Sequence, residues 1–218
     1  EMLESDVVIT NSRGLHGIPI AEHILGVMIM LARQLHVAYR YQLEGIWPRR
    51  EMFDLYPTFA ELHAQTAGII GLGGIGMAVA ERLKAMGMRV IATKRTIEQL
   101  PACVDEVLGT QGLPRLLQES DFVIIAAPLT PQTAGLIGEQ ELRLMKPTAH
   151  IINVGRGPII QEEVLIRALK EGWIAGAGLD VTDPEPPQAD SELFRLPNVI
   201  LTPHYSGHSA GPPDQWDQ

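Results

Sequence analysis

Three things are scarce in this chain, and each absence excludes a class of protein. Cys103 is the only cysteine, so no internal disulfide and no cysteine-based metal site can form, and we interpret it as an inert filler residue. The formal net charge is −9, which argues against nucleic acid because a phosphate-binding surface needs surplus lysine and arginine. The longest apolar run, residues 24–32, is too short to cross a bilayer. We therefore expect a cytoplasmic protein that binds no membrane.

The second half of the chain alternates short apolar runs with stretches of helical spacing. Hydrophobic residues make up 45% of the sequence, enough for a sizeable core. Strands are expected at residues 67–70, 90–92, 122–126, 150–154, 175–181 and 199–202, and helices at 77–86, 113–119, 139–145 and 161–171. Strands that alternate with helices need crossover connections, which make the strands parallel and cover both sheet faces. The pattern predicts a doubly wound α/β fold.

The first part of the chain follows a different pattern. We expect a strand at residues 5–10 and one long helix from Ala21 to about Tyr41. An irregular segment rich in aromatic residues follows, at positions 47–59. Such apolar density packs either on the domain itself or on a partner chain, and the sequence leaves both open. The chain starts at Glu1 in a stretch typical of mid-domain sequence, so we expect a partial sequence.

A glycine pattern lies between the first apolar run of the second half and the helix after it. Gly71, Gly73 and Gly76 form Gly-x-Gly-x-x-Gly, which is weak alone but meaningful between a strand and a helix. The first glycine permits the tight turn, the second a close approach of backbone to pyrophosphate, and the third close helix packing. We expect a dinucleotide phosphate on this helix N-terminus, against the alternative of a glycine-rich turn without ligand.

Two cations follow the second expected strand. An NAD site usually has Asp or Glu here to bind the adenosine ribose, whereas this chain has Lys94 and Arg95. The pair would attract the 2′-phosphate of NADP, or it is simply a solvated strand end. NADP is favoured over NAD, and both stay open.

Several blocks of sequence resemble the D-isomer-specific 2-hydroxyacid dehydrogenases in order and spacing. They are the glycine loop 71–76, Ser-Asp-Phe-Val at 120–123, Pro-Leu-Thr-Pro-Gln-Thr at 128–133, Met-Lys-Pro at 145–147, Ile-Asn-Val-Gly-Arg-Gly at 152–157, Gly-Leu-Asp-Val at 178–181, Glu-Pro at 185–186 and Asn-Val-Ile-Leu-Thr-Pro-His at 198–204. The similarity runs from about residue 7 to residue 207.

The resemblance implies three catalytic residues. Arg156 would bind the substrate carboxylate, because its planar guanidinium matches that group. Glu185 and His204 would form the acid/base pair, in which the carboxylate orients the ring and favours the imidazolium. Singly, each has a structural alternative: a cap on strand-end carbonyls, a solvated loop acid, and a buried structural histidine. All three follow expected strands, at the edge where ligands bind in open α/β sheets.

The resemblance also implies a set of cofactor contacts. Asp180 would lie near the nicotinamide carboxamide. The full expected set is Gly71, Leu72, Gly73, Gly74, Ile75, Gly76, Lys94, Arg95, Pro128, Thr133, Val154, Gly155, Asp180, His204 and Gly207, with no metal ligand. His16, His23 and His36 match no catalytic motif, so we expect structural roles for them.

The resemblance divides the chain unevenly. Residues 1–17 would be a remnant of the family's substrate lobe, 18–204 the dinucleotide-binding domain, and 205–218 a tail toward the lobe. Most of the substrate lobe would precede this chain, so the chain alone is expected to bind cofactor but to turn over substrate poorly. The family also dimerises through this domain, and residues 21–59 are the expected homodimer surface.

Three functions stay open at the level of sequence. The favoured one is an NAD(P)-dependent reductase of small 2-oxo acids to D-2-hydroxy acids. A formate-type dehydrogenase is disfavoured, because Glu185 stands where those proteins are expected to carry glutamine. A cofactor-sensing binding protein like the C-terminal-binding corepressors has the same fold and keeps the catalytic-looking residues.

Overall fold

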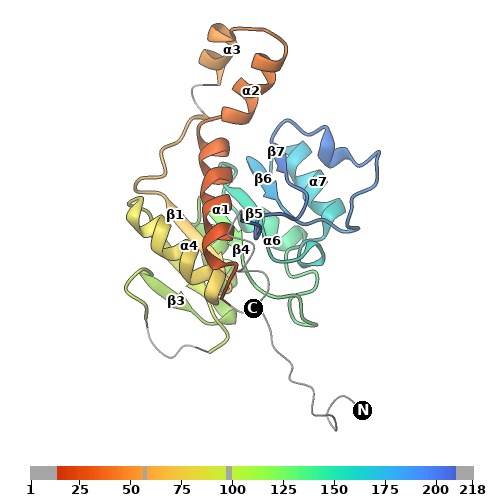
Figure 1. Ribbon diagram of the computed structural model, residues 1–218. Coiled ribbons are helices and arrows are strands. Elements are labelled where there is room, and N and C mark those ends of the chain that lie inside the picture. The colour runs from red at the N-terminus through yellow and green to blue at the C-terminus, as the bar shows by residue number, and fades with distance from the viewer. Residues whose placement is uncertain (1–13, 56–57, 97–99, 210–218) are drawn as a thin grey trace.

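A seven-stranded parallel sheet forms the centre of the protein, in the order β3-β2-β1-β4-β5-β6-β7 (Figure 1). The computed structural model describes residues 14–55, 58–96 and 100–209. The strands are β1 Thr66–Ile70, β2 Arg89–Thr93, β3 Glu106–Leu108, β4 Phe122–Ile125, β5 His150–Asn153, β6 Gly176–Leu179 and β7 Val199–Leu201. All six strands expected in the second half are present, and the doubly wound α/β fold is confirmed.

Helices cover both faces of this sheet. α1 (Gly17–Ala32) and α4 (Gly74–Ala85) pack on each other and on one face. α5 (Leu113–Glu119), α6 (Glu139–Leu144) and α7 (Glu162–Glu171) cover the other. Short 3₁₀ turns lie at Thr110–Gly112, Gly157–Ile159 and Glu192–Phe194. Two further helices, α2 (Leu35–Leu43) and α3 (Arg49–Asp54), project away from the sheet, and we call them the arm (Figure 1).

The apolar strands supply both halves of the core. Successive strand residues point to opposite faces, so Phe122 and Ile124 of β4 pack toward α1 and α4. Val123 and Ile125 pack toward α5–α7. Every residue of β1 and β4 is buried. This two-sided burial explains why the strands read as continuous apolar runs.

The expected long helix from Ala21 to Tyr41 is wrong. The chain forms α1 and α2, which are bent by 76° relative to each other. Gln34 at the break has a left-handed backbone with φ 54°. α1 buries Ile24, Met28 and Leu31 completely, whereas α2 leaves most of its apolar side chains exposed. The bend lets α1 stay in the core while α2 leaves it.

The third strand in chain order was not expected. β3 has only three half-buried residues, one of them Glu106, and it forms the sheet edge beside β2. A run this short gives no apolar signal of its own. The strand expected at residues 5–10 lies outside the described residues. Among those that are described, no single helix is long and apolar enough to cross a membrane, although the bent pair α1–α2 meets that test together.

The order of the strands locates the ligand-binding edge. Chain order runs outward from β1 in one direction through β2 and β3, and from β4 in the other. β1 and β4 are hydrogen-bonded neighbours. In open α/β sheets, ligands bind beyond the carboxyl ends of the strands at this reversal. The glycine loop follows β1, so it lies at that point.

Candidate active site

The glycine loop has the backbone geometry that the sequence predicts. Gly71 has φ 98°, and a Cβ there would lie 2.8 Å from the backbone of Ala127. A Cβ on Gly76 would lie 2.3 Å from the carbonyl oxygen of Gly71, so any side chain would push α4 away. Around Gly73 and Gly74, by contrast, nothing lies within 4 Å of a built Cβ. The loop is therefore tight on its inner side and open on its outer side.

That open side faces the first turn of α4. Gly73 is the N-cap of this 12-residue helix and supplies no side-chain hydrogen bond to it. The first backbone N–H groups of a helix have no partner within the helix, and the helix dipole adds positive potential there. Leu72 is buried and Ile75 half-buried, which anchors the loop to the core. The residues present fit a pyrophosphate group.

Lys94 and Arg95 lie directly beside this loop. They follow β2, and the amide of Gly71 donates to the carbonyl of Thr93 at 3.1 Å. Lys94 is half-buried, with its backbone amide bonded to Leu108 of β3, while Arg95 is exposed. Both cations thus stand at the corner next to the phosphate cradle.

The loop after β4 is organised by a threonine hydroxyl. Thr133 Oγ1 donates to the carbonyl oxygen of Pro128 at 2.7 Å and accepts from the amide of Thr130 at 2.8 Å. These bonds fold residues 128–133 into a compact turn beyond the carboxyl end of β4. Thr133 therefore shapes the loop, with its hydroxyl proton directed at Pro128.

A buried asparagine shapes the turn that carries Arg156. Asn153 is 1% exposed at the end of β5; its Nδ2 donates to the carbonyl of Arg156 and its Oδ1 accepts from the amide of Gly155, both at 3.0 Å. Val154 is buried between them. Arg156 is exposed, and its Nη1 donates to the carbonyl of Gly155 at 2.7 Å. The guanidinium is thus oriented by its own turn, with other N–H groups available.

The Arg156 turn packs directly on the loop after β6. A Cβ on Gly157 would lie 1.9 Å from the carbonyl oxygen of Thr182. The same loop is fixed from α7, where Glu162 Oε2 accepts from the amide of Asp183 at 2.9 Å. Burial raises the pKa of Glu162. Sequence reasoning missed Glu162 and Gly157 as positioning residues, because neither type signals chemistry by itself.

Asp180 is the hub of the site. It is 3% exposed at the end of β6. Its carboxylate accepts three hydrogen bonds, from the hydroxyl of Thr202 at 2.6 Å and from the amides of Tyr205 and Ser206 at 3.2 and 3.1 Å. Its backbone carbonyl accepts from the amide of His204 at 2.9 Å. A buried carboxylate needs such partners, and here they tie β6 to the segment after β7.

His204 and Glu185 are brought together across 19 positions of sequence. Nδ1 of His204 and Oε1 of Glu185 share a short hydrogen bond. His204 has a left-handed backbone with φ 51°, which is uncommon for a residue with a side chain. The bonds from its amide to Asp180 and Thr202 hold it there. Because Nδ1 is engaged by Glu185, Nε2 is the ring atom left to face a substrate.

The pair lines a cleft of about 480 Å³ beyond the ends of β6 and β7. Asp180, Thr182 and Thr202 line its inner end, and Pro186, Pro187, Phe194, Leu201 and Pro203 make its walls apolar. Arg156 is outside the lining and approaches from the β5 turn. Gly207 lies farther along, where its carbonyl contacts Nδ1 of His16 at 3.1 Å.

The geometry offers a carboxylate-oriented imidazole, an exposed guanidinium and an anion-binding helix end on one edge of a parallel sheet. Comparison with known proteins agrees with it. The family model described as "D-isomer specific 2-hydroxyacid dehydrogenase, NAD binding domain" matches residues 25–206. A glyoxylate reductase of Thermococcus gammatolerans is 42% identical over 214 residues, covering 97% of this chain and 63% of its own.

Solved structures show the same likeness. A D-isomer specific 2-hydroxyacid dehydrogenase from Xanthobacter autotrophicus Py2, in complex with NADPH and MES, has a TM-score of 0.81 at 33% identity, over 96% of this chain and 83% of its own. An NAD-dependent formate dehydrogenase from Staphylococcus aureus, in complex with NAD, has a TM-score of 0.81 at 30% identity, over 89% of this chain and 57% of its own. The chain spans about 63% of the length of the glyoxylate reductase. It belongs to the D-isomer specific 2-hydroxyacid dehydrogenase family, through that family's NAD-binding domain.

Proposed function

We propose that this chain is the cofactor domain of a reductase that converts small 2-oxo acids to D-2-hydroxy acids with NAD(P)H. The observation that carries the proposal is the hydrogen bond between His204 Nδ1 and Glu185, at the same sheet edge as the phosphate cradle. A cofactor-sensing binding protein would need the cradle alone. A carboxylate-oriented imidazole beside that cradle is a device for moving protons.

His204 is the proton donor in this proposal. Reduction of a 2-oxo acid builds negative charge on the C2 oxygen, and that oxygen needs a proton. Glu185 engages Nδ1, so the proton leaves from Nε2. The carboxylate also favours the charged ring, which therefore arrives with a proton to give.

Arg156 binds the substrate in this proposal. A guanidinium offers parallel N–H groups in one plane, which match the two oxygens of a carboxylate. Its own turn, held by Asn153, directs it from the end of β5 toward the edge that carries His204. The carboxylate and the adjacent carbonyl of a 2-oxo acid are the groups that this cation would hold.

The glycine loop, with the first turn of α4, would hold the pyrophosphate of the cofactor, and Asp180 would face its nicotinamide carboxamide. Pro128, Thr133, Val154, Gly155 and Gly207 complete the proposed binding edge. The bound nicotinamide supplies the hydride. We propose NADPH as the preferred form, because Lys94 and Arg95 stand where the adenosine ribose would lie, and a 2′-phosphate there would meet two cations. The family likeness itself covers both cofactors, since one structure holds NADPH and another NAD.

The substrate lobe would come from a segment outside this chain. We keep residues 1–17 as a remnant of that lobe, 18–204 as the dinucleotide domain and 205–218 as the tail; residues 1–13 and 210–218 lie outside the described ranges. Glyoxylate is the first substrate to test, because the relative from Thermococcus gammatolerans is named a glyoxylate reductase. The cytoplasm, with its nicotinamide pools, is the compartment we expect.

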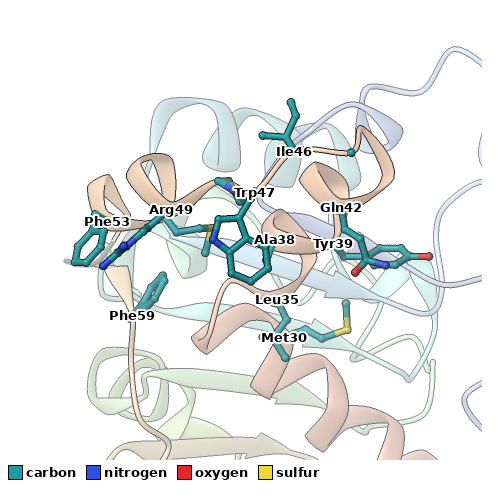
Figure 2. A pocket seen from close by; sticks show the side chains of 13 residues that line it. Met30, Leu35, Ala38, Tyr39, Gln42, Ile46, Trp47, Arg49, Phe53 and Phe59 are labelled. Carbon is teal, nitrogen blue, oxygen red and sulfur yellow. The ribbon is translucent and has the colours of Figure 1, made fainter.

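We also propose a symmetric homodimer built on the arm. A groove of about 1290 Å³ lies between the end of α1, α2, α3 and Phe59, with Met30, Leu35, Tyr39 and Trp47 around it (Figure 2). Trp47 is 89% exposed, and Leu43 and Phe53 are also exposed. Apolar surface of this extent on a projecting arm needs a cover, and a second copy of the same arm is self-complementary in a twofold dimer.

The proposed activity is tested by following NADPH and NADH oxidation by the full-length protein with glyoxylate, hydroxypyruvate and pyruvate. The proposal expects turnover of at least one of these 2-oxo acids and a D product from pyruvate. Tight cofactor binding without turnover of any of them would favour the cofactor-sensing class instead. Oxidation of formate with NAD would favour the formate-type reading.

A further inference from the structure

His23 is a half-buried histidine on α1 that the proposed mechanism does not use. Its Nε2 lies 3.3 Å from Oγ1 of Thr202. Its ring also meets the ring of Tyr205 edge-to-face, with centroids 5.5 Å apart and an interplanar angle of 88°. Thr202 and Tyr205 flank His204 by two positions and one. The ring therefore contacts the His204 segment on both sides of the proposed proton donor.

The hydrogen-bond roles along this contact can be deduced. Thr202 Oγ1 lies 2.6 Å from Oδ1 of Asp180, and a carboxylate can only accept, so the single hydroxyl proton points at Asp180. Toward His23 the hydroxyl oxygen must then accept, which requires a proton on Nε2 of His23. The chain of donors runs from His23 through Thr202 to Asp180. Hydrogen bonds aligned in this way polarise one another.

The end of this chain of donors is the carboxylate that fixes the backbone around His204. Asp180 accepts the amides of Tyr205 and Ser206, and its carbonyl accepts the amide of His204. His204 itself sits at φ 51°, a conformation that its surroundings must maintain. Burial lowers the pKa of His23, against the opposing influence of the Asp180 charge, which keeps the ring uncharged near neutral pH. A neutral Nε2–H ring suits the donor role.

We propose that His23 is a positioning residue: through the hydroxyl of Thr202 it orients Asp180, and thereby the left-handed segment that aims His204 at the substrate. The inference rests on the proposed function for its catalytic consequence, but the donor chain itself is a property of the fold. It assigns a purpose to a histidine for which the sequence indicated only a structural role.

The first arm of the test is independent of activity. Imidazole ¹⁵N spectra of the full-length protein, labelled at histidine and recorded at pH 8, should show His23 as the Nε2–H tautomer, with its signals identified by their loss in His23→Gln. The His204 signals should move in His23→Phe, which keeps a ring but has no donor, and should return toward their original positions in His23→Gln. An Nδ1–H tautomer, or unchanged His204 signals in His23→Phe, would overturn the proposal.

The second arm measures turnover. His23→Phe should lower kcat about ten- to hundredfold, the scale expected for a misplaced catalytic group, and His23→Gln should recover most of it because the amide donates from the same place. Thr202→Val should lower kcat and make the His23→Phe change nearly silent. His63→Phe, an exposed histidine in the turn before β1, is the matched control. Equal loss in His23→Phe and His23→Gln contradicts the positioning role, whereas an inactive parent contradicts only the proposed function, since the spectra still decide the donor chain.

Discussion

Glu185 and His204 form an exposed pair whose hydrogen bond joins two loops, one after β6 and one after β7. The carboxylate has two effects on the ring: it fixes which nitrogen faces outward, and its negative charge favours the protonated form. Glutamine in its place keeps a hydrogen-bond acceptor but removes the charge. The two effects can therefore be separated by one substitution.

In Glu185→Gln, the rate of 2-oxo acid reduction should fall at a lower pH than in the parent. Reduction needs the imidazolium, and without the neighbouring carboxylate the ring loses its proton earlier as the pH rises. The measurement is the pH–rate profile of kcat/KM for both proteins. Asp183→Asn, which removes an exposed carboxylate two positions away, is the control and should leave the profile in place. An alkaline limb at the same pH in Glu185→Gln would mean that Glu185 does not tune His204.

Cofactor choice is also decided by single residues. Replacing Lys94 and Arg95 together by alanine should weaken NADPH by roughly 1.5–3 kcal/mol, about 10- to 150-fold, and should barely affect NADH, which has no 2′-phosphate. Fluorescence titration of both cofactors measures this. Lys170→Ala with Arg195→Ala removes the same charge near β7, at the opposite edge of the sheet from β2 and β3, and should change neither affinity. Equal affinity of the parent protein for the two cofactors would contradict the assignment.

At the scale of elements, the arm is the part of the chain without a cover. Substituting Trp47 and Phe53 by lysine should convert the proposed dimer to a monomer, because two charges in an apolar contact lose their hydration without gaining a partner. Sedimentation velocity at micromolar concentration gives the mass. Met86→Lys, at an exposed apolar position after α4, is the matched control and should stay dimeric. A monomeric parent would remove the basis for the homodimer.

The elements also show how far sequence reasoning reaches. The strands from β4 to β7 were predictable because buried parallel strands are continuous apolar runs, and the glycine loop because its backbone excludes side chains at Gly71 and Gly76. The break at Gln34 was not, since no glycine or proline marks it and tertiary packing of α1 decides where the helix ends. β3 was too short to detect.

The site was predictable to a similar extent. Motifs located Arg156, Glu185 and His204, and the structure brings Glu185 and His204 into contact. The supporting bonds, from Thr202 to Asp180 and from Asp183 to Glu162, join residues more than 20 positions apart through the fold. Such pairs have no local pattern, so the sequence alone does not indicate them.

At the scale of the whole molecule, acid should destabilise the protein through His150. This ring lies at the start of β5, stacked on Phe122, and burial together with the nearby His36 lowers its pKa to about 4. An unfolded chain binds the proton at about pH 6.5, so the unfolded state holds more protons between the two values and stability falls with pH across that window. Full passage from pH 6.5 to 4 should cost about 3 kcal/mol.

Urea unfolding at pH 7.5, 5.5 and 4.5 measures this dependence. His150→Gln should flatten it, because the amide does not titrate, whereas His63→Gln at an exposed site should leave it unchanged. An equally steep loss in His150→Gln would assign the acid sensitivity to other groups, His36 first, since burial also lowers its pKa.

The account as a whole depends on His204 giving a proton to the product of hydride transfer while the glycine loop alone holds the cofactor's phosphates. The most direct measurement is the kcat of NADPH oxidation at saturating glyoxylate for the full-length parent and His204→Ala, with NADPH affinity measured on the same preparations. We predict that kcat falls about 100- to 10,000-fold while the affinity barely changes. A His204→Ala protein that reduces glyoxylate at the parent's rate would contradict the account.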